Sequence, residues 1–140
     1  MRYMVLAAGL LFSMQAFSAG DKGRASDLNS AGMAELEMGQ NVSAAEYFTQ
    51  AIEKDPLQKI YYNNLAAACI RMGDYEEAER QLKIAIAIDP GYARALSNMS
   101  VVLFKTGRYR ESYEYYLRAK KSDPSYISIR FDRKRVMAKL

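Results

Sequence analysis

The stretch KIYYNNLAAACIRMGDYEEAERQLKIAIAIDPGY, residues 59–92, is one complete copy of a unit that recurs along this chain. Its Asp89-Pro90 dipeptide has counterparts at Asp55-Pro56 and Asp123-Pro124, so the three prolines stand 34 residues apart. A constant period of this size is typical of stacked supersecondary units, none of which can bury its apolar face alone. The sequence therefore predicts a repeat protein with units over 25–58, 59–92 and 93–126.

Each unit has the pattern of two helices separated by a turn. Glycine is the fifteenth residue of every unit, at Gly39, Gly73 and Gly107, where a left-handed residue is expected to end the first helix. Proline ends the second helix, because the residue before a proline is disfavoured in the α region. Asp74, three residues before Glu77, has the spacing of a capping box and predicts a helix start. Offsets of three, four and seven mark one packing face of each first helix. The residues on these faces are Leu28/Ala31/Gly32, Tyr62/Leu65/Ala66/Cys69 and Leu96/Met99/Ser100/Leu103.

The pattern resembles the tetratricopeptide repeat (TPR) family. The later part of that family's motif combines a small residue, an aromatic residue four positions on, an alanine and a proline. The matching residues are Ala44/Phe48/Ala51/Pro56, Ala78/Leu82/Ala85/Pro90 and Ser112/Tyr116/Ala119/Pro124. The early part of the motif matches less well. The chain has no tryptophan, and the position where the family usually has a tyrosine is occupied by Glu35, Cys69 and Leu103 in the three units. The resemblance implies an all-α fold, a right-handed α-solenoid of three helix-turn-helix units.

The first residues have a different character. Arg2 precedes an apolar run over 4–17, and small residues follow it. This is the pattern of a secretory signal peptide, which we place at 1–19 with cleavage at one of positions 18–20, followed by a linker over 20–24. An uncleaved leader or a membrane tether is the alternative. The signal predicts an exported protein in the periplasm of a Gram-negative bacterium.

The other end of the chain is basic. Residues 21–90 contain 7 Lys/Arg and 12 Asp/Glu, a net charge of −5, whereas residues 91–140 contain 12 Lys/Arg and 4 Asp/Glu, a net charge of +8. A helical pattern over 127–140 predicts a capping helix, because repeat arrays need a polar-backed end. Its charge could attract an acidic protein tail, anionic lipid or a polyanion. The alternative is a solvated helix face.

Catalytic and metal-binding chemistry find little support. The chain has no histidine, the commonest general base and metal ligand, and no phosphate loop, zinc spacing or nucleophile elbow. We expect no enzyme activity, no cofactor and no metal site, and no nucleic-acid partner for an exported chain. Cys69, the single cysteine, falls on a packing face and is expected to be a buried thiol.

The family resemblance places peptide-groove residues near the second, fifth, sixth, ninth, twelfth and thirteenth positions of each unit. Asn64 and Asn98 share the sixth position, and Ser30 and Asp132 extend that row. Each side-chain amide offers a donor and an acceptor to a peptide backbone, whereas repeat copying is the alternative explanation. The candidate groove residues are Asn29, Ser30, Met33, Asn63, Asn64, Ala67, Ile70, Arg71, Arg94, Ser97, Asn98, Val101, Phe104 and Lys105.

The predicted function is a periplasmic adaptor that binds an extended protein segment, as an accessory factor of envelope, pilus or secretion-system assembly. The family's carboxylate clamp is doubtful, because Asn29, Met33 and Asn98 stand where that subtype carries other residues. Two alternatives stay open. One is a self-associating module that joins its acidic and basic ends, and the other is an anionic membrane-surface protein that uses the basic cap. The oligomeric state is left open.

Overall fold

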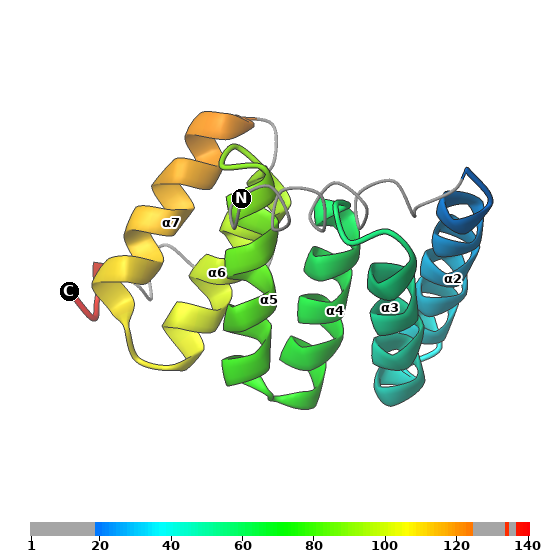
Figure 1. Cartoon of the computed structure of the whole chain (residues 1–140). Helices are drawn as coiled ribbons and strands as arrows, with labels where there is room; N and C mark the ends of the chain where they lie inside the picture. The colour runs from blue at the N-terminus through cyan, green and yellow to red at the C-terminus, as the bar shows by residue number, and fades with distance from the viewer. Residues whose placement is uncertain (1–18, 125–133, 135–136) are drawn as a thin grey trace, which may run out of the picture.

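The computed structural model describes residues 19–124, 134 and 137–140. Over this part of the chain the elements are all α-helical, which confirms the all-α repeat fold. Figure 1 shows them following one another in sequence order from α2 at one end to α7 at the other, with successive helices antiparallel. Their bounds are α2 Ala19–Glu37, α3 Asn41–Lys54, α4 Lys59–Met72, α5 Tyr75–Ile88, α6 Ala93–Lys105 and α7 Tyr109–Ser122.

The helices form two layers. Each helix contacts the next one along the chain, and α4 also contacts both α2 and α6. We call α2, α4 and α6 the inner helices and α3, α5 and α7 the outer helices. An inner helix is thus the first helix of each sequence unit, and the contacts between inner helices bring residues of different units side by side.

The predicted turns are confirmed at all three glycines. Gly39, Gly73 and Gly107 have φ values of 79°, 80° and 81°, a left-handed conformation that other L residues adopt only with strain. At the end of α4, the N–H of Gly73 donates to the carbonyl of Ile70, and the N–H of Asp74 donates to that of Cys69. These bonds satisfy carbonyls that the helix end would leave unpaired.

The Asp-Pro dipeptides end the outer helices, as predicted. Asp55, Asp89 and Asp123 are the C-caps of α3, α5 and α7, with φ values of −148°, −139° and −142°. The aspartate itself has a role that proline alone did not predict. The Oδ1 atom of Asp89 accepts a hydrogen bond from the N–H of Gly91 at 3.0 Å, and Asp55 does the same for Leu57 at 3.4 Å. The carboxylate therefore orders the turn into the next inner helix.

The core follows the repeat positions. Ala44, Phe48, Ala51, Ala78, Leu82 and Ala85 of the outer helices are fully buried. The predicted packing faces of the inner helices are also buried, except that Leu28 and Ala31 are half-buried. Cys69 lies in this core, as expected, and Tyr62 of α4 belongs to the same cluster, whereas Tyr61 packs in a smaller cluster with Ala25 and Ala51. One cluster of buried side chains runs from Leu36 of α2 to Leu103 of α6.

One boundary prediction is wrong. Residues 20–24 are helical and belong to α2, whereas the sequence was expected to form a linker there. Gly20 and Gly23 are poor helix formers, but Asp21 lies in the first turn, where a carboxylate is favourable, and the buried Ala25 ties this turn to the core. Residues 1–18 of the predicted signal peptide and most of the capping segment over 127–140, including Asp132, lie outside the described residues.

Candidate functional site

The candidate site is one surface of the three inner helices. Residues four, seven and eleven positions apart return to the same side of an α-helix, because eleven residues make about three turns. One such stripe of four residues exists on each inner helix, and we call the three stripes together the inner-helix face. The stripes are Ser26/Ser30/Met33/Glu37 on α2, Ile60/Asn64/Ala67/Arg71 on α4 and Arg94/Asn98/Val101/Lys105 on α6.

A relay of asparagine amides crosses the inner helices. Nδ2 of Asn98 donates to Oδ1 of Asn63 at 2.9 Å. Nδ2 of Asn63 donates to Oδ1 of Asn64 on the same helix at 3.4 Å, and Nδ2 of Asn64 donates to Oδ1 of Asn29 at 2.9 Å. The sixth position of one unit therefore bonds the fifth position of the unit before it, and the relay links α6, α4 and α2.

The relay gives the recurring asparagines a structural role that the sequence interpretation missed. Asn29 and Asn63 also stand one period apart, so the signal was present as a second row of amides beside Asn64 and Asn98. Each amide keeps hydrogen-bonding capacity beyond the relay, because an NH₂ group has two hydrogens and a carbonyl oxygen two lone pairs. The predicted peptide ladder is thus compatible with the relay and stays a prediction.

The other candidate residues differ in exposure. Ser30, Met33, Arg71, Arg94 and Lys105 are exposed. The half-buried candidates are Asn29, Asn64, Ala67, Ile70, Asn98 and Phe104. Asn63, Ser97 and Val101 are buried, with 5%, 3% and 6% of their surface exposed, so a ligand would reach them only after a local movement. The exposed and half-buried residues are therefore the better candidates for direct contact.

Two candidates make contacts that explain their presence in the fold. The guanidinium of Arg71 donates to the carbonyl oxygen of Leu36, in the last turn of α2. A cation is favourable there, because the last carbonyls of a helix carry partial negative charge. The ring of Phe104 packs edge-on against Tyr109 at the start of α7, with 5.4 Å between ring centroids. Both side chains join two helices near the glycine turns that end the inner helices.

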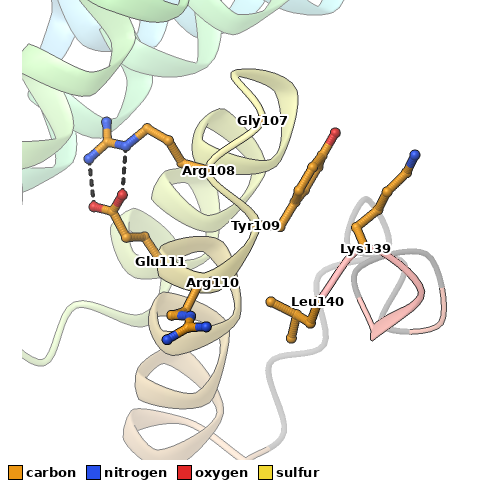
Figure 2. Close-up of a pocket in the computed structure, with 7 residues that line it drawn as sticks. All are labelled: Gly107, Arg108, Tyr109, Arg110, Glu111, Lys139 and Leu140. Carbon is orange, nitrogen blue, oxygen red and sulfur yellow. Dashed lines mark hydrogen bonds and ion pairs between the residues drawn. The ribbon is translucent and has the colours of Figure 1, made fainter.

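A separate hollow lies where α7 begins. Its volume is about 310 Å³, and Figure 2 shows Tyr109 and Arg110 facing the chain's last residues, Lys139 and Leu140, across it. Arg108 at its edge forms ion pairs with Glu111 at 2.6 Å and with Glu79 of α5 at 2.8 Å. None of the fourteen candidate residues lines this hollow.

The Arg108 cluster perturbs its carboxylates. Hydrogen bonds from Lys83 and Arg108 hold the pKa of Glu79 below its ordinary value. The hydrogen bond from Arg108 does the same to the pKa of Glu111. A lowered carboxylate pKa beside arginine is the signature of an ion pair and not of a proton-transferring group. We therefore assign this cluster to the stacking of α5 on the α6–α7 turn.

Among the residues that the structure describes, no group of three or more His, Cys, Asp or Glu side chains is placed to hold a metal ion. Within the same residues, no helix has the length and apolar character needed to cross a membrane.

Comparison with known proteins places the chain in a family. A family model described as the coatomer epsilon subunit matches residues 5–134. The small glutamine-rich tetratricopeptide repeat-containing protein beta of Homo sapiens is 38% identical over 58 residues, which are 41% of this chain and 19% of that protein. The chain thus matches only a minor part of that relative's length.

Two solved structures share the fold. The Arabidopsis OM64 TPR domain has a TM-score of 0.82 and 22% identity, covering 86% of this chain and 99% of that one. The first TPR of Spaghetti (RPAP3), bound to the HSP90 peptide SRMEEVD, has a TM-score of 0.73 and 23% identity, covering 76% and 84%. The match over residues 5–134 and these likenesses lead to one conclusion: the chain belongs to the coatomer epsilon subunit family, and its fold is a TPR-like helical repeat.

Proposed function

We propose that this protein is an adaptor that binds an extended segment of a partner protein on the inner-helix face. The observation that carries the proposal is the asparagine relay, which sets side-chain amides in a line across α2, α4 and α6. Amides suit an extended peptide, because they can bond its N–H and C=O groups with little regard to sequence. The exposed side chains of Met33 and Ile60 supply apolar contacts beside the relay.

The comparisons support this proposal at the level of fold. The TPR of Spaghetti (RPAP3), which has the same helical arrangement, is bound to a peptide, SRMEEVD. A helical repeat of this kind presents one extended surface built from equivalent residues of successive units. We carry over the binding of a peptide and not the identity of that peptide.

We further propose that the protein acts in the cell envelope. The basic residue, apolar run and small residues over 1–20 support export to the periplasm of a Gram-negative bacterium. There it would serve as an accessory factor in the assembly of the envelope, a pilus or a secretion system. Mass spectrometry of the protein from envelope fractions tests the export step. A mature chain that begins between residues 19 and 21 is expected, and an intact Met1 would contradict it.

Site-specific photo-crosslinking tests the binding surface. Ile60 on the inner-helix face and Ile84 on the outer helix α5 are a matched pair, with 41% and 40% of their surface exposed. A photoreactive residue at position 60 is expected to capture a defined partner in living cells, and the same residue at position 84 is not. Equal capture at both positions, or capture only at position 84, would reject the inner-helix face as the binding surface.

An amide variant tests the relay itself. Asn64→Ala/Asn98→Ala removes both half-buried amides of the sixth position and is expected to abolish crosslinking from position 60. The loss counts only if the variant keeps its helical circular dichroism and unfolds cooperatively, because the relay also joins the inner helices. A folded variant that still crosslinks at the wild-type level would refute the amide mechanism.

A further inference from the structure

The inner helices α4 and α6 contain no carboxylate. Their sequences, KIYYNNLAAACIRM and ARALSNMSVVLFK, carry four cations, Lys59, Arg71, Arg94 and Lys105. Each of the other described helices contains Asp or Glu. The inner helix α2 has four such residues, Asp21, Asp27, Glu35 and Glu37. The inner-helix face is therefore positive over α4 and α6 and carries an acidic residue, Glu37, on α2.

Two of the four cations are used within the fold. Lys59 forms an ion pair with Asp89 and lies 4.9 Å from the centroid of the Tyr92 ring. Arg71 donates to the carbonyl of Leu36. In contrast, Arg94 and Lys105 are exposed, and the ion pairs and side-chain hydrogen bonds within residues 19–124 do not include either of them. These two side chains are the unengaged cations of the inner-helix face.

Their spacing sets what they can bind together. Arg94 and Lys105 are eleven residues apart on α6, so they share one side of the helix and lie about 16 Å apart along its axis. A single carboxylate could pair with both cations only if both side chains stretched toward each other along the helix axis, because an ion pair needs its atoms within about 4 Å. Two carboxylates on one segment pair with the two cations without that constraint.

Asn98 lies between the two cations with its side chain oriented by the relay. Its Nδ2 atom donates to Asn63, whereas its Oδ1 atom accepts no hydrogen bond from a described residue. Val101, one turn further on, is buried at the same stripe. The stripe thus offers a ligand a cation, an amide oxygen and a second cation in order, with the buried Val101 between the last two.

From this order, and resting on the proposed peptide-binding function, we propose that α6 binds an acidic, extended segment of a partner protein through two carboxylates. One carboxylate pairs with Arg94 and the other with Lys105, and Asn98 accepts a backbone N–H between them. In an extended chain, residues four apart point to the same side and are about 13 Å apart. Long arginine and lysine side chains cover the remaining distance. The segment therefore carries Asp or Glu at two positions four residues apart, and needs no free C-terminal carboxylate.

The test is a titration with synthetic peptides followed by NMR of the ¹⁵N-labelled protein. The first probe is a nine-residue peptide, acetylated and amidated, with two glutamates four positions apart among alanine, valine and serine. A second probe carries the two glutamates side by side, and a third carries glutamine at both positions. The first probe is expected to shift amide signals of α6 and to bind at least about threefold more tightly than the other two, a difference that raised salt reduces.

Charge-removal variants assign the contacts. Arg94→Gln/Lys105→Gln is expected to weaken the first probe about three- to tenfold, as two exposed ion pairs would. Lys120→Gln, an exposed lysine on α7, is the matched control and is expected to bind like wild type. Binding that is unchanged in the double variant, or equal for the spaced and adjacent glutamates, would overturn the proposal. A second outcome would also overturn it: no peptide binds, and vesicles with anionic lipid bind the wild type but not the double variant.

The outcomes separate this inference from the proposed function. If the residue at position 60 captures a partner and Arg94→Gln/Lys105→Gln captures it equally well, the inner-helix face binds peptide but the carboxylate contacts are refuted. If position 60 captures nothing, the proposed function itself fails. The two failures are distinguishable, because crosslinking does not depend on the sequence of any synthetic probe.

Discussion

Gly32 of α2 lies directly against the ring of Phe48 in α3. A Cβ atom at Gly32 would stand 2.6 Å from Cε1 of Phe48, a distance that real contacts do not reach. Gly32 occupies the eighth position of its unit, where the later units have Ala66 and Ser100. The first unit therefore accommodates its phenylalanine by giving up the side chain opposite.

Gly32→Ala is expected to destabilise the protein by about 1–3 kcal/mol, although alanine is the better helix former. Phe48 is fully buried and cannot swing away without disturbing the core. Gly23→Ala in the same helix is the control, because a Cβ there meets nothing within 4 Å. It is expected to stabilise the protein by up to about 1 kcal/mol. Urea unfolding measures both, and effects of the same sign would contradict the contact.

Gly73→Ala is expected to cost about 1–2 kcal/mol through the backbone alone. The glycine has a φ of 80° and no atom within 4 Å of a Cβ position, so the cost comes from conformation and not from crowding. Asn tolerates the left-handed region better than alanine, so Gly73→Asn should lose less. Thermal unfolding of the two variants checks this order, and equal losses would argue against conformational strain.

Asp74→Ala is expected to destabilise the protein by about 1 kcal/mol. The Asp74 carboxylate accepts the N–H of Glu77 at 3.1 Å and caps the start of α5, as the sequence predicted. Gln40 holds the equivalent place before α3 and makes no side-chain capping bond. Gln40→Ala is therefore expected to be nearly neutral. A comparable loss in the two variants would show that the capping bond contributes nothing.

Stability is expected to fall in acid partly through Glu79. Its pKa is lowered in the folded protein from the ordinary 4.5, because Lys83 and Arg108 bond the ionised form. A lowered pKa contributes stability that is present above the unfolded value and is lost as pH falls through the folded one. Arg108→Gln should thus destabilise by about 0.2–1 kcal/mol at pH 7 and by less at pH 3. Urea midpoints at the two pH values measure the difference, and a constant gap would refute the assignment.

The Cys69 thiol is expected to react slowly in the folded protein. Burial, with smaller contributions from Asp74 and Glu77, raises its pKa to about 11, and only 3% of the residue is exposed. The thiolate is the reactive species, so little of it exists at pH 8. Ellman's reagent should react at the rate of unfolding in water and rapidly in concentrated urea. Rapid reaction without urea would show that Cys69 is accessible in the native state.

The backbone plan of this protein could be predicted from its sequence, because local rules decide it. Glycine at the fifteenth position and Asp-Pro at the end of each unit are confirmed as turn and helix end in the structure. The prediction of a linker over 20–24 was wrong. The low helix propensity of the two glycines there is outweighed by the packed helix that follows, which continues toward the N-terminus through these residues. The bonds of the asparagine relay were not predicted, and the candidate residues as a binding site stay a prediction.

What the sequence alone determined is the period, and with it which residues are equivalent between units. Only the tertiary structure decided which residues of neighbouring units meet. The repeat places Asn63 and Asn98 in neighbouring units, but the offset between two packed helices sets whether the sixth position bonds the fifth. The same holds for Arg71 on the Leu36 carbonyl and Arg108 on Glu79. Side chains reach across helices according to distance and direction in space, which a one-dimensional period does not contain.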